Sequence, residues 1–255
     1  MKTSFAAVTG VFLVLLGSLT NLFGQSDAEA RAAEITKALV NGHRAWRSKM
    51  STSGASVIVR EVERKGQVVK YGLQVIGLPT EELYTVMSWP VGQGEPSALI
   101  EGVSIGQNGT VICAGRMPEQ CGDPSKKDDP VDFVFNPTKG EPYRIALIAG
   151  EYRATIVIVP DPITATDKGC TLSVERLMPK FELAYITGSG FPPNTEASFD
   201  SESHGERRQI KQKVDNDGNL DFALLPFVAG HKSGTTTIKG VGMKCSPTVR
   251  FDWGD

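Results

Sequence analysis

The chain carries the same series of short motifs twice, in the same order along the sequence. Four pairs match: Gly77-Leu78-Pro79 with Gly190-Phe191-Pro192, Asn108-Gly109 with Asp217-Gly218, Asp132-Phe133 with Asp221-Phe222, and Lys168-Gly169-Cys170 with Met243-Lys244-Cys245. A chance match of one short string would not preserve the order of four. An internal repeat constrains the architecture before any local pattern does, so this one predicts two related modules in tandem.

The N-terminus has the features of a secretory signal peptide, predicted over residues 1–24. Lys2 is followed by an apolar run from Phe5 to Phe23, and small and polar residues then form a cleavage site at Gly24-Gln25, with Ala28-Glu29-Ala30 as a second candidate. The alternative is an uncleaved membrane anchor, although polar residues dilute the run and later segments are too short to span a bilayer. We therefore expect an exported protein, periplasmic or secreted, that touches the membrane only through an uncleaved signal peptide.

The charge balance argues against nucleic acid as a partner. The chain has 27 Lys and Arg residues against 29 Asp and Glu residues, mixed along its length without a basic stripe. No motif for a cofactor or for a nucleophile and its base stands out. The sequence therefore predicts no cofactor and favours a protein that is not an enzyme.

Two patterns of apolar residues follow the signal peptide. Residues 26–50 place Ile35, Leu39, Val40 and Trp46 at helical spacing, which predicts one amphipathic helix. From residue 55 the period becomes that of strands, with Gly, Pro and Asn-Gly turns between them. We expect a mainly β protein with one β-sandwich over residues 55–176, elaborated by a polar insertion at 114–130, and a smaller sandwich over 180–255.

The second module resembles bacterial extracytoplasmic immunoglobulin-like domains, most clearly over residues 180–254. The resemblance lies in the segment Ile186-Thr187-Gly188-Ser189-Gly190-Phe191-Pro192-Pro193-Asn194-Thr195 and in the turn Asp215-Asn216-Asp217-Gly218-Asn219. It implies two tandem antiparallel immunoglobulin-like sandwiches. Such domains mostly bind, space or scaffold, so the resemblance transfers no catalytic residue.

Four cysteines in an exported chain favour two disulfides. We expect a local bridge between Cys113 and Cys121, and a bridge between Cys170 and Cys245 that ties one module to the other. The competing scheme pairs Cys113 with Cys170 and Cys121 with Cys245. Zinc is not expected, because no Cys-x-x-Cys pair or nearby His accompanies the thiols.

Two further sets of residues are candidates for ligand binding. Aromatic side chains could form a platform that stacks on sugars, the candidates being Tyr71, Tyr84, Trp89 and Trp253. Oxygen ligands alternate around Gly218 at Asp215, Asp217, Asn219 and Asp221, although their spacing is not that of an EF-hand and a plain hairpin turn is the simpler interpretation. The cluster of Glu202, His204 and Glu206 is interpreted as an exposed hairpin tip.

The sequence thus predicts an exported, non-enzymatic binding or structural module of the bacterial envelope or cell surface. Its partner would be an envelope or surface protein, contacted through sandwich loops or an exposed edge strand. The alternatives are a carbohydrate-binding module that uses the exposed aromatics and a hydrolase with its site in the insertion of the first module.

Overall fold

The computed structural model describes residues 33–47, 50–113, 129–178, 180, 182–242 and 244–254. The predicted signal peptide, Cys121 and all but the end of the insertion lie outside these ranges. The chain divides into two units, residues 1–42 and residues 43–255. Residues 33–47 are helical, and among the described residues no helix has the length and apolar character needed to cross a membrane.

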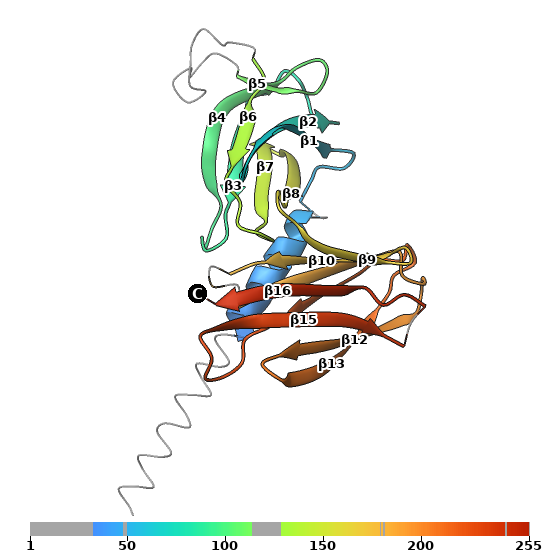
Figure 1. The fold of residues 1–255 in the computed structure, drawn as a ribbon. Coiled ribbons are helices and arrows are strands. Elements are labelled where there is room, and N and C mark those ends of the chain that lie inside the picture. The colour runs from blue at the N-terminus through green and yellow to red at the C-terminus, as the bar shows by residue number, and fades with distance from the viewer. Residues whose placement is uncertain are drawn as a thin grey trace, which may run out of the picture. The chain divides into compact units, whose positions relative to one another are not determined.

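Beyond this helix the described chain is mainly β, with antiparallel pairing between all its strands (Figure 1). The first eight strands are β1 (Ser56–Lys65), β2 (Val68–Ile76), β3 (Tyr84–Trp89), β4 (Ser97–Ile105), β5 (Val111–Cys113), β6 (Asp132–Phe135), β7 (Tyr143–Ala149) and β8 (Tyr152–Ile158). The other eight are β9 (Ile163–Asp167), β10 (Cys170–Arg176), β11 (Ala184–Ser189), β12 (Glu196–Ser203), β13 (Glu206–Lys213), β14 (Leu220–Leu224), β15 (Ser233–Val241) and β16 (Thr248–Gly254).

Strands β1–β8 form what we call the first sandwich. One sheet has the order β1-β2-β6 and the other β5-β4-β3-β7-β8. Strand β2 alternates strictly, with every second side chain buried, as expected when one face of a sheet covers a core and the other meets solvent. Val69, Leu73, Val86 and Leu147 are among the residues that fill this core.

Strands β9–β16 form the second sandwich, with sheets of order β14-β11-β10-β9 and β13-β12-β15-β16. Its core is built around three phenylalanines. Phe199 lies 5.9 Å from Phe191 and 5.4 Å from Phe222 between ring centroids, which are distances at which aromatic pairs attract.

The boundary between the two sandwiches lies earlier in the chain than residue 176, the end predicted for the first module. Strand β10, assigned there to the end of the first module, pairs with β11 from Thr171↔Ser189 to Arg176↔Ala184. Strand β9 was not predicted and joins β10 through a tight turn in which Lys168 and Gly169 both have positive φ. The chain therefore passes from one sandwich to the other near Pro160 and Pro162.

The two sandwiches share one pattern of strand connections. The sheet β1-β2-β6 corresponds to β10-β11-β14, and the run β4-β3-β7-β8 corresponds to β13-β12-β15-β16. The repeated Gly-Leu-Pro and Gly-Phe-Pro motifs fall at the same place, directly after β2 and β11. Both glycines, Gly77 and Gly190, have φ near +77°, and a side chain on either would collide with a backbone carbonyl oxygen, that of Gly54 or Gly169.

The second repeated motif forms the same turn in both sandwiches. The Gly106 N–H donates to Thr110 O at 2.8 Å, and the Asp215 N–H donates to Asn219 O at 2.8 Å. In each turn the glycine, Gly109 or Gly218, takes the positive φ that the geometry requires. Asn108, the residue before Gly109, does not adopt positive φ.

The corresponding strands β4 and β13 are shielded from further pairing by different means; β13 is an edge strand, whereas β4 pairs with β5 over Val103–Ile105 and has a free edge only before that. Strand β13 carries five charged side chains in eight residues, and inward or edge charges oppose the addition of another strand. Strand β4 has one charged residue, Glu101, but its register against β3 shifts twice within six residues. Such bulges twist an edge and interrupt its row of hydrogen-bonding groups.

The disulfide between Cys170 and Cys245 is present, with the two residues 75 positions apart in sequence. It excludes the scheme that pairs Cys113 with Cys170. The repeat led us to expect that this bridge would tie one module to the other. That expectation was wrong, because both sulfurs belong to the core of the second sandwich. Cys170 begins β10 in one sheet and Cys245 lies between β15 and β16 of the other, so the bridge joins two sheets of one sandwich. Cys113 is also disulfide-bonded.

Candidate functional site

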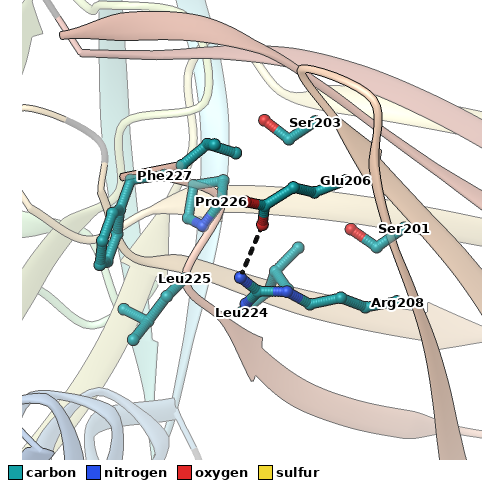
Figure 2. A pocket seen from close by; sticks show the side chains of 9 residues that line it. Ser201, Ser203, Glu206, Arg208, Leu224, Leu225, Pro226 and Phe227 are labelled. Atoms are coloured by element: carbon teal, nitrogen blue, oxygen red, sulfur yellow. Dashed lines mark hydrogen bonds and ion pairs between the residues drawn. The ribbon is translucent and has the colours of Figure 1, made fainter. Parts of the chain in front are cut away.

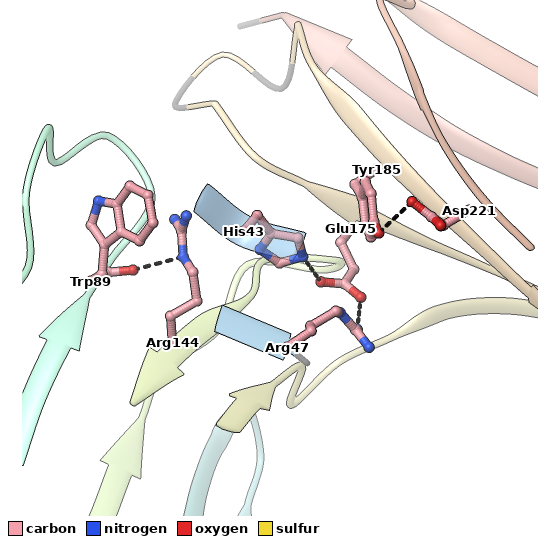
Figure 3. A network of polar contacts seen from close by, with 7 residues as sticks. All are labelled: His43, Arg47, Trp89, Arg144, Glu175, Tyr185 and Asp221. Carbon is pink, nitrogen blue, oxygen red and sulfur yellow. Dashed lines mark hydrogen bonds and ion pairs between the residues drawn. The ribbon is translucent and has the colours of Figure 1, made fainter. Parts of the chain in front are cut away.

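A buried polar cluster forms where residues 43–47, the last turn of the helix, contact both sandwiches (Figure 3). On the side of the first sandwich, the Trp46 Nε1–H donates to Ile145 O at 3.1 Å, and the Trp46 ring lies 5.7 Å from that of Trp89. On the side of the second sandwich, His43 and Arg47 both contact the carboxylate of Glu175. Residues 43–47 thus act as a clasp between the two sandwiches.

A second set of contacts fixes this clasp on the second sandwich. Arg44 donates to Asp221 Oδ2, with its Nε at 2.8 Å, and the Tyr185 hydroxyl donates to the same oxygen at 2.7 Å. The His43 ring packs edge-on against Tyr185 at 4.9 Å between centroids. Burial, followed by the hydrogen bond to Asp221, raises the pKa of Tyr185 to about 12, so the phenol keeps its proton and remains a donor.

His43 is neutral in this environment. Its side chain has no exposed surface, and burial, with the nearby charges of Arg144 and Arg47, lowers its pKa to about 3. Its Nε2 lies 2.9 Å from Glu175 Oε2, yet the two groups are not aligned as a hydrogen bond. The carboxylate of Glu175 therefore has Arg47 as its charged partner.

Arg144 is the fully buried cation of the cluster, with 1% of its surface exposed. Its Nε–H donates to Trp89 O at 3.0 Å, and its guanidinium lies 4.0 Å from the centroid of the Trp89 ring, a cation–π contact. Burial lowers the pKa of Arg144 to about 10, so the group stays charged at neutral pH. Because His43, Glu175 and Arg144 are all at most 2% exposed, a substrate could not reach them, and their role is to join structural elements.

Sequence reasoning did not find this cluster. The sequence pattern placed Trp46 on the apolar face of a helix. His43 and Arg47 are four positions apart and so share one helical face, but no acidic partner was predicted for them. The signal in the sequence was Glu175, an acid close to the apolar residues Leu172 and Val174 in a strand-like segment. In the structure this segment is strand β10, and Glu175 is buried. Charged residues are rarely fully buried unless they are paired, so such a position implies a cationic partner.

The predicted aromatic platform does not exist. Tyr71, Tyr84, Trp89 and Trp253 are all buried, at 8%, 0%, 8% and 2% exposure, and they lie in or beside the cores of two different sandwiches. Their polar atoms point to internal acceptors: the Trp89 Nε1–H donates to Gln93 O at 2.8 Å, and the Trp253 Nε1–H donates to Ser203 Oγ at 3.1 Å. None of the four can offer a ring face to a sugar, which corrects the expectation.

The acidic residues around Gly218 are used within the protein. Asp215 Oδ1 accepts hydrogen bonds from the backbone N–H groups of Asp217 and Asn219, at 2.9 and 2.7 Å, and so caps the turn. Asp221 faces Arg44 and Tyr185 instead. Within the part of the chain that the structure describes, no cluster of three or more His, Cys, Asp or Glu residues could hold a metal ion, so the hairpin turn explains the pattern.

A small hollow in the second sandwich is lined by Ser203 and Glu206, the residues on either side of the turn that holds His204 (Figure 2). His204 has positive φ, its ring stacks on His231 at 3.8 Å, and its Nε2 lies 2.9 Å from Ser233 O. The hollow lies beneath Pro226 and beside Ser201, with a volume of about 10 Å³. That is room for one water molecule, not for an organic ligand.

The outer face of the sheet β1-β2-β6 carries exposed apolar side chains together with Arg60, Lys70, Gln74 and Asp132. Its apolar side chains are Ile58, Val62, Ile76 and Val134, with 45–61% of their surface exposed. Gly72 lies among them without a side chain, and a methyl group added there would meet Val62 at 3.4 Å. An open groove of about 590 Å³ lies over Gly72, between Arg60 and Val62 on one wall and Asp129–Asp132 on the other. We call this surface the Gly72 face.

Comparisons with known proteins give no family and no relative. No protein-family model matches the chain, and a search of curated proteins finds no match. The case for a function therefore depends on the geometry of the chain's own residues.

Proposed function

We propose that this protein is an exported, non-enzymatic binding or structural module of the bacterial envelope or cell surface that works through protein–protein contacts. The observation that carries the proposal is the Gly72 face, which combines four exposed apolar side chains with a groove lined in part by Val62 and Gly72. Exposed apolar surface that a folded chain does not use for itself is typical of a contact site for another protein.

Export is supported by two independent features. Residues 1–24 have the composition of a signal peptide. The Cys170–Cys245 bridge is of a kind that persists in oxidising compartments and is rare in the cytosol. Periplasmic and secreted locations fit both features equally.

An immunoglobulin-like fold produced by internal duplication is supported by the strand order. In immunoglobulin lettering, β1, β2 and β6 (and β10, β11 and β14) correspond to strands A, B and E, and β4-β3-β7-β8 (and β13-β12-β15-β16) to C′-C-F-G. Antibody constant domains instead have sheets A-B-E-D and C-F-G, without a strand paired beside C. Strand β5 beside β4 and strand β9 beside β10 are additions to this arrangement. The equivalent turns at Gly77 and Gly190, and at Gly109 and Gly218, add to this support. Domains of this architecture commonly serve as scaffolds for binding surfaces, although fold alone does not assign function.

The distribution of exposed apolar side chains indicates which sandwich makes the contact. Seven large exposed apolar residues of the described chain belong to the first sandwich: Ile58, Val62, Val68, Ile76, Leu83, Leu99 and Val134. The second sandwich has two, Leu225 and Phe227. We therefore assign binding to the first sandwich and a supporting role to the second, with the clasp at residues 43–47 holding them together.

The test is affinity capture from the protein's own envelope fraction, read out by quantitative mass spectrometry. The wild-type protein is compared with an Ile58→Asp/Val134→Asp variant, which places two charges on the Gly72 face. We expect proteins enriched by the wild type to be lost with this variant, because a contact residue at the centre of an interface contributes about 1 kcal/mol or more to binding.

The matched control is Phe227→Asp, which adds a charge at an exposed apolar position of the second sandwich. It should capture the same proteins as the wild type, and soluble cell-wall polysaccharide added as competitor should not displace them. Equal capture by the wild type and the Gly72-face variant, or displacement by the polysaccharide, would contradict the proposal.

A further inference from the structure

The outer face of the sheet β14-β11-β10-β9 carries two rows of hydroxyl side chains. The strand register places Thr171 between Thr166 and Ser189, and Ser173 between Thr164 and Thr187. Side chains opposite each other in paired strands lie on the same face, so these six residues form a flat array that we call the hydroxyl face. Two of these hydroxyls, those of Thr166 and Thr171, form a hydrogen bond with each other at 2.9 Å.

The other outer face of the same sandwich has a different chemistry. The solvent-facing positions of β13-β12-β15-β16 include the charged residues Asp200, Glu202, Arg207, Lys211, Lys239, Arg250 and Asp252. Charged side chains are the usual way to keep an exposed sheet soluble. On the face of β14-β11-β10-β9 the register also places Asp221 opposite Thr187 and Glu175 two positions from Ser173. Both carboxylates are bound by Arg44, Arg47 and Tyr185, so the side chains left open to solvent beside them are the hydroxyls.

A groove of about 560 Å³ lies over the hydroxyl face, a size within the range of small-molecule sites. Four members of the array line it: Thr171, Ser173, Thr187 and Ser189. The remaining lining residues are Arg47, Gln212, Lys213, Asp215, Asn219, Leu220, Asp221 and Gly188. Two cationic and two acidic side chains balance each other in this set, so the groove does not select for a charged ligand.

The charged groups at its rim are held in place by the contacts described above. The Arg47 guanidinium is fixed by buried Glu175, and the Asp221 carboxylate by Arg44 and Tyr185. The Asp215 carboxylate is fixed by the backbone of its own turn. Groups that are already oriented lose little entropy when a ligand binds, which is the arrangement a recognition site requires.

We propose that the groove over the hydroxyl face binds a neutral saccharide chain. Every Ser and Thr hydroxyl both donates and accepts hydrogen bonds, as do the hydroxyls of a sugar, and the amides of Gln212 and Asn219 do the same. A protein partner is disfavoured, because the centres of protein interfaces are enriched in apolar and aromatic side chains, which this face lacks. The site is distinct from the Gly72 face and from the four buried aromatic residues.

The test is an NMR titration of the ¹⁵N-labelled protein with cellohexaose, chitohexaose and maltohexaose, each to millimolar concentration. We expect at least one of them to shift the amide signals of β10 and β11. A Ser173→Ala/Thr187→Val variant should bind that saccharide about thirtyfold more weakly, since each of the two lost hydrogen bonds between neutral groups contributes about 1 kcal/mol.

The matched control is Thr235→Val/Thr237→Val, which removes two hydroxyls from the opposite, charged face of the same sandwich. Its affinity should equal that of the wild type. The proposal is overturned if none of the three saccharides shifts β10 and β11, if the control weakens binding as much as the test variant, or if only an anionic heparin hexasaccharide binds.

This inference and the proposed protein contact fail separately. The Ile58→Asp/Val134→Asp variant should leave the saccharide titration unchanged, because those residues belong to the other sandwich. The Ser173→Ala/Thr187→Val variant should leave protein capture unchanged. A variant that abolished both would indicate loss of folding, which its amide spectrum would reveal.

Discussion

Glu175 lies with its carboxylate between His43 and Arg47, two residues of the helix that precedes both sandwiches by sequence. The side chain of Glu175 is 3% exposed and that of His43 has no exposed surface. Because His43 is neutral, the attachment of residues 43–47 to Glu175 depends on the ion pair between the Glu175 carboxylate and Arg47.

Replacement of Glu175 by Gln should lower the free energy of unfolding by about 1.5–3 kcal/mol, because the charged hydrogen bond between buried Glu175 and Arg47 is lost, while Arg47, with 35% of its side chain exposed, stays partly solvated. Urea denaturation followed by circular dichroism measures this. The control is Glu202→Gln, which breaks an exposed pair with Arg207 and should change stability by less than about 1 kcal/mol. Equal effects of the two substitutions would show that the Glu175 pair is not structurally important.

The stability of the protein should fall as the pH is lowered from about 6.5 toward 3, in part because of His43. Its pKa is about 3 in the folded protein against 6.5 in the unfolded chain, so the unfolded state binds a proton first as the pH falls. Each unit of pKa difference corresponds to about 1.4 kcal/mol. A His43→Gln variant should therefore lose less stability than the wild type over this range; parallel pH profiles would refute the assignment.

Removal of the Cys170–Cys245 bridge should destabilise the second sandwich by roughly 3–5 kcal/mol on the chain-entropy estimate, since the closed loop is long. The change is a Cys170→Ser/Cys245→Ser double variant, and the measurement is thermal unfolding without reductant. Peptide mapping of the wild type under non-reducing conditions should yield a fragment that links these two cysteines. A fragment linking Cys113 to Cys170 would contradict the structure.

Gly77→Ala should be markedly more destabilising than Gly66→Ala. Both glycines have positive φ, which costs an alanine about 1 kcal/mol. A methyl group at Gly77 would also collide with the carbonyl oxygen of Gly54, whereas nothing lies within 4 Å of one at Gly66. Denaturation midpoints measure the difference, and equal losses would mean that the contact between Gly77 and Gly54 is not close. Gly190→Ala should behave like Gly77→Ala if the two turns are equivalent.

Local structure followed from local sequence. Strand β2 occupies residues 68–76, where apolar and polar side chains alternate as expected from residue 55 onward, and the turns at Gly109 and Gly218 lie at the Asn-Gly and Asp-Gly pairs. Alternation and turn residues are properties of neighbouring positions, so they can be read from the sequence. Strand β9 was missed because it is short, largely polar and preceded by Pro160 and Pro162, a composition that also fits a loop.

What the sequence did not determine is how distant segments meet. Cys170 was matched with Cys245 correctly, but the expected link between modules was wrong, because pairing of β10 with β11 places both residues in one sandwich. The exposure of Trp89 and Trp253 was likewise misjudged, since burial at a strand end depends on which element packs over it.

The sequence by itself thus determined the mainly β class, most strand positions, the special turns and the reason to expect disulfides, because each depends on residues close together in the chain. Only the tertiary structure decided that Glu175 has His43 and Arg47 as partners, that the hydroxyls of three strands share one face, and that the candidate sugar platform is buried. Those facts depend on contacts between residues up to more than a hundred positions apart, and periodicity carries no information about such pairs.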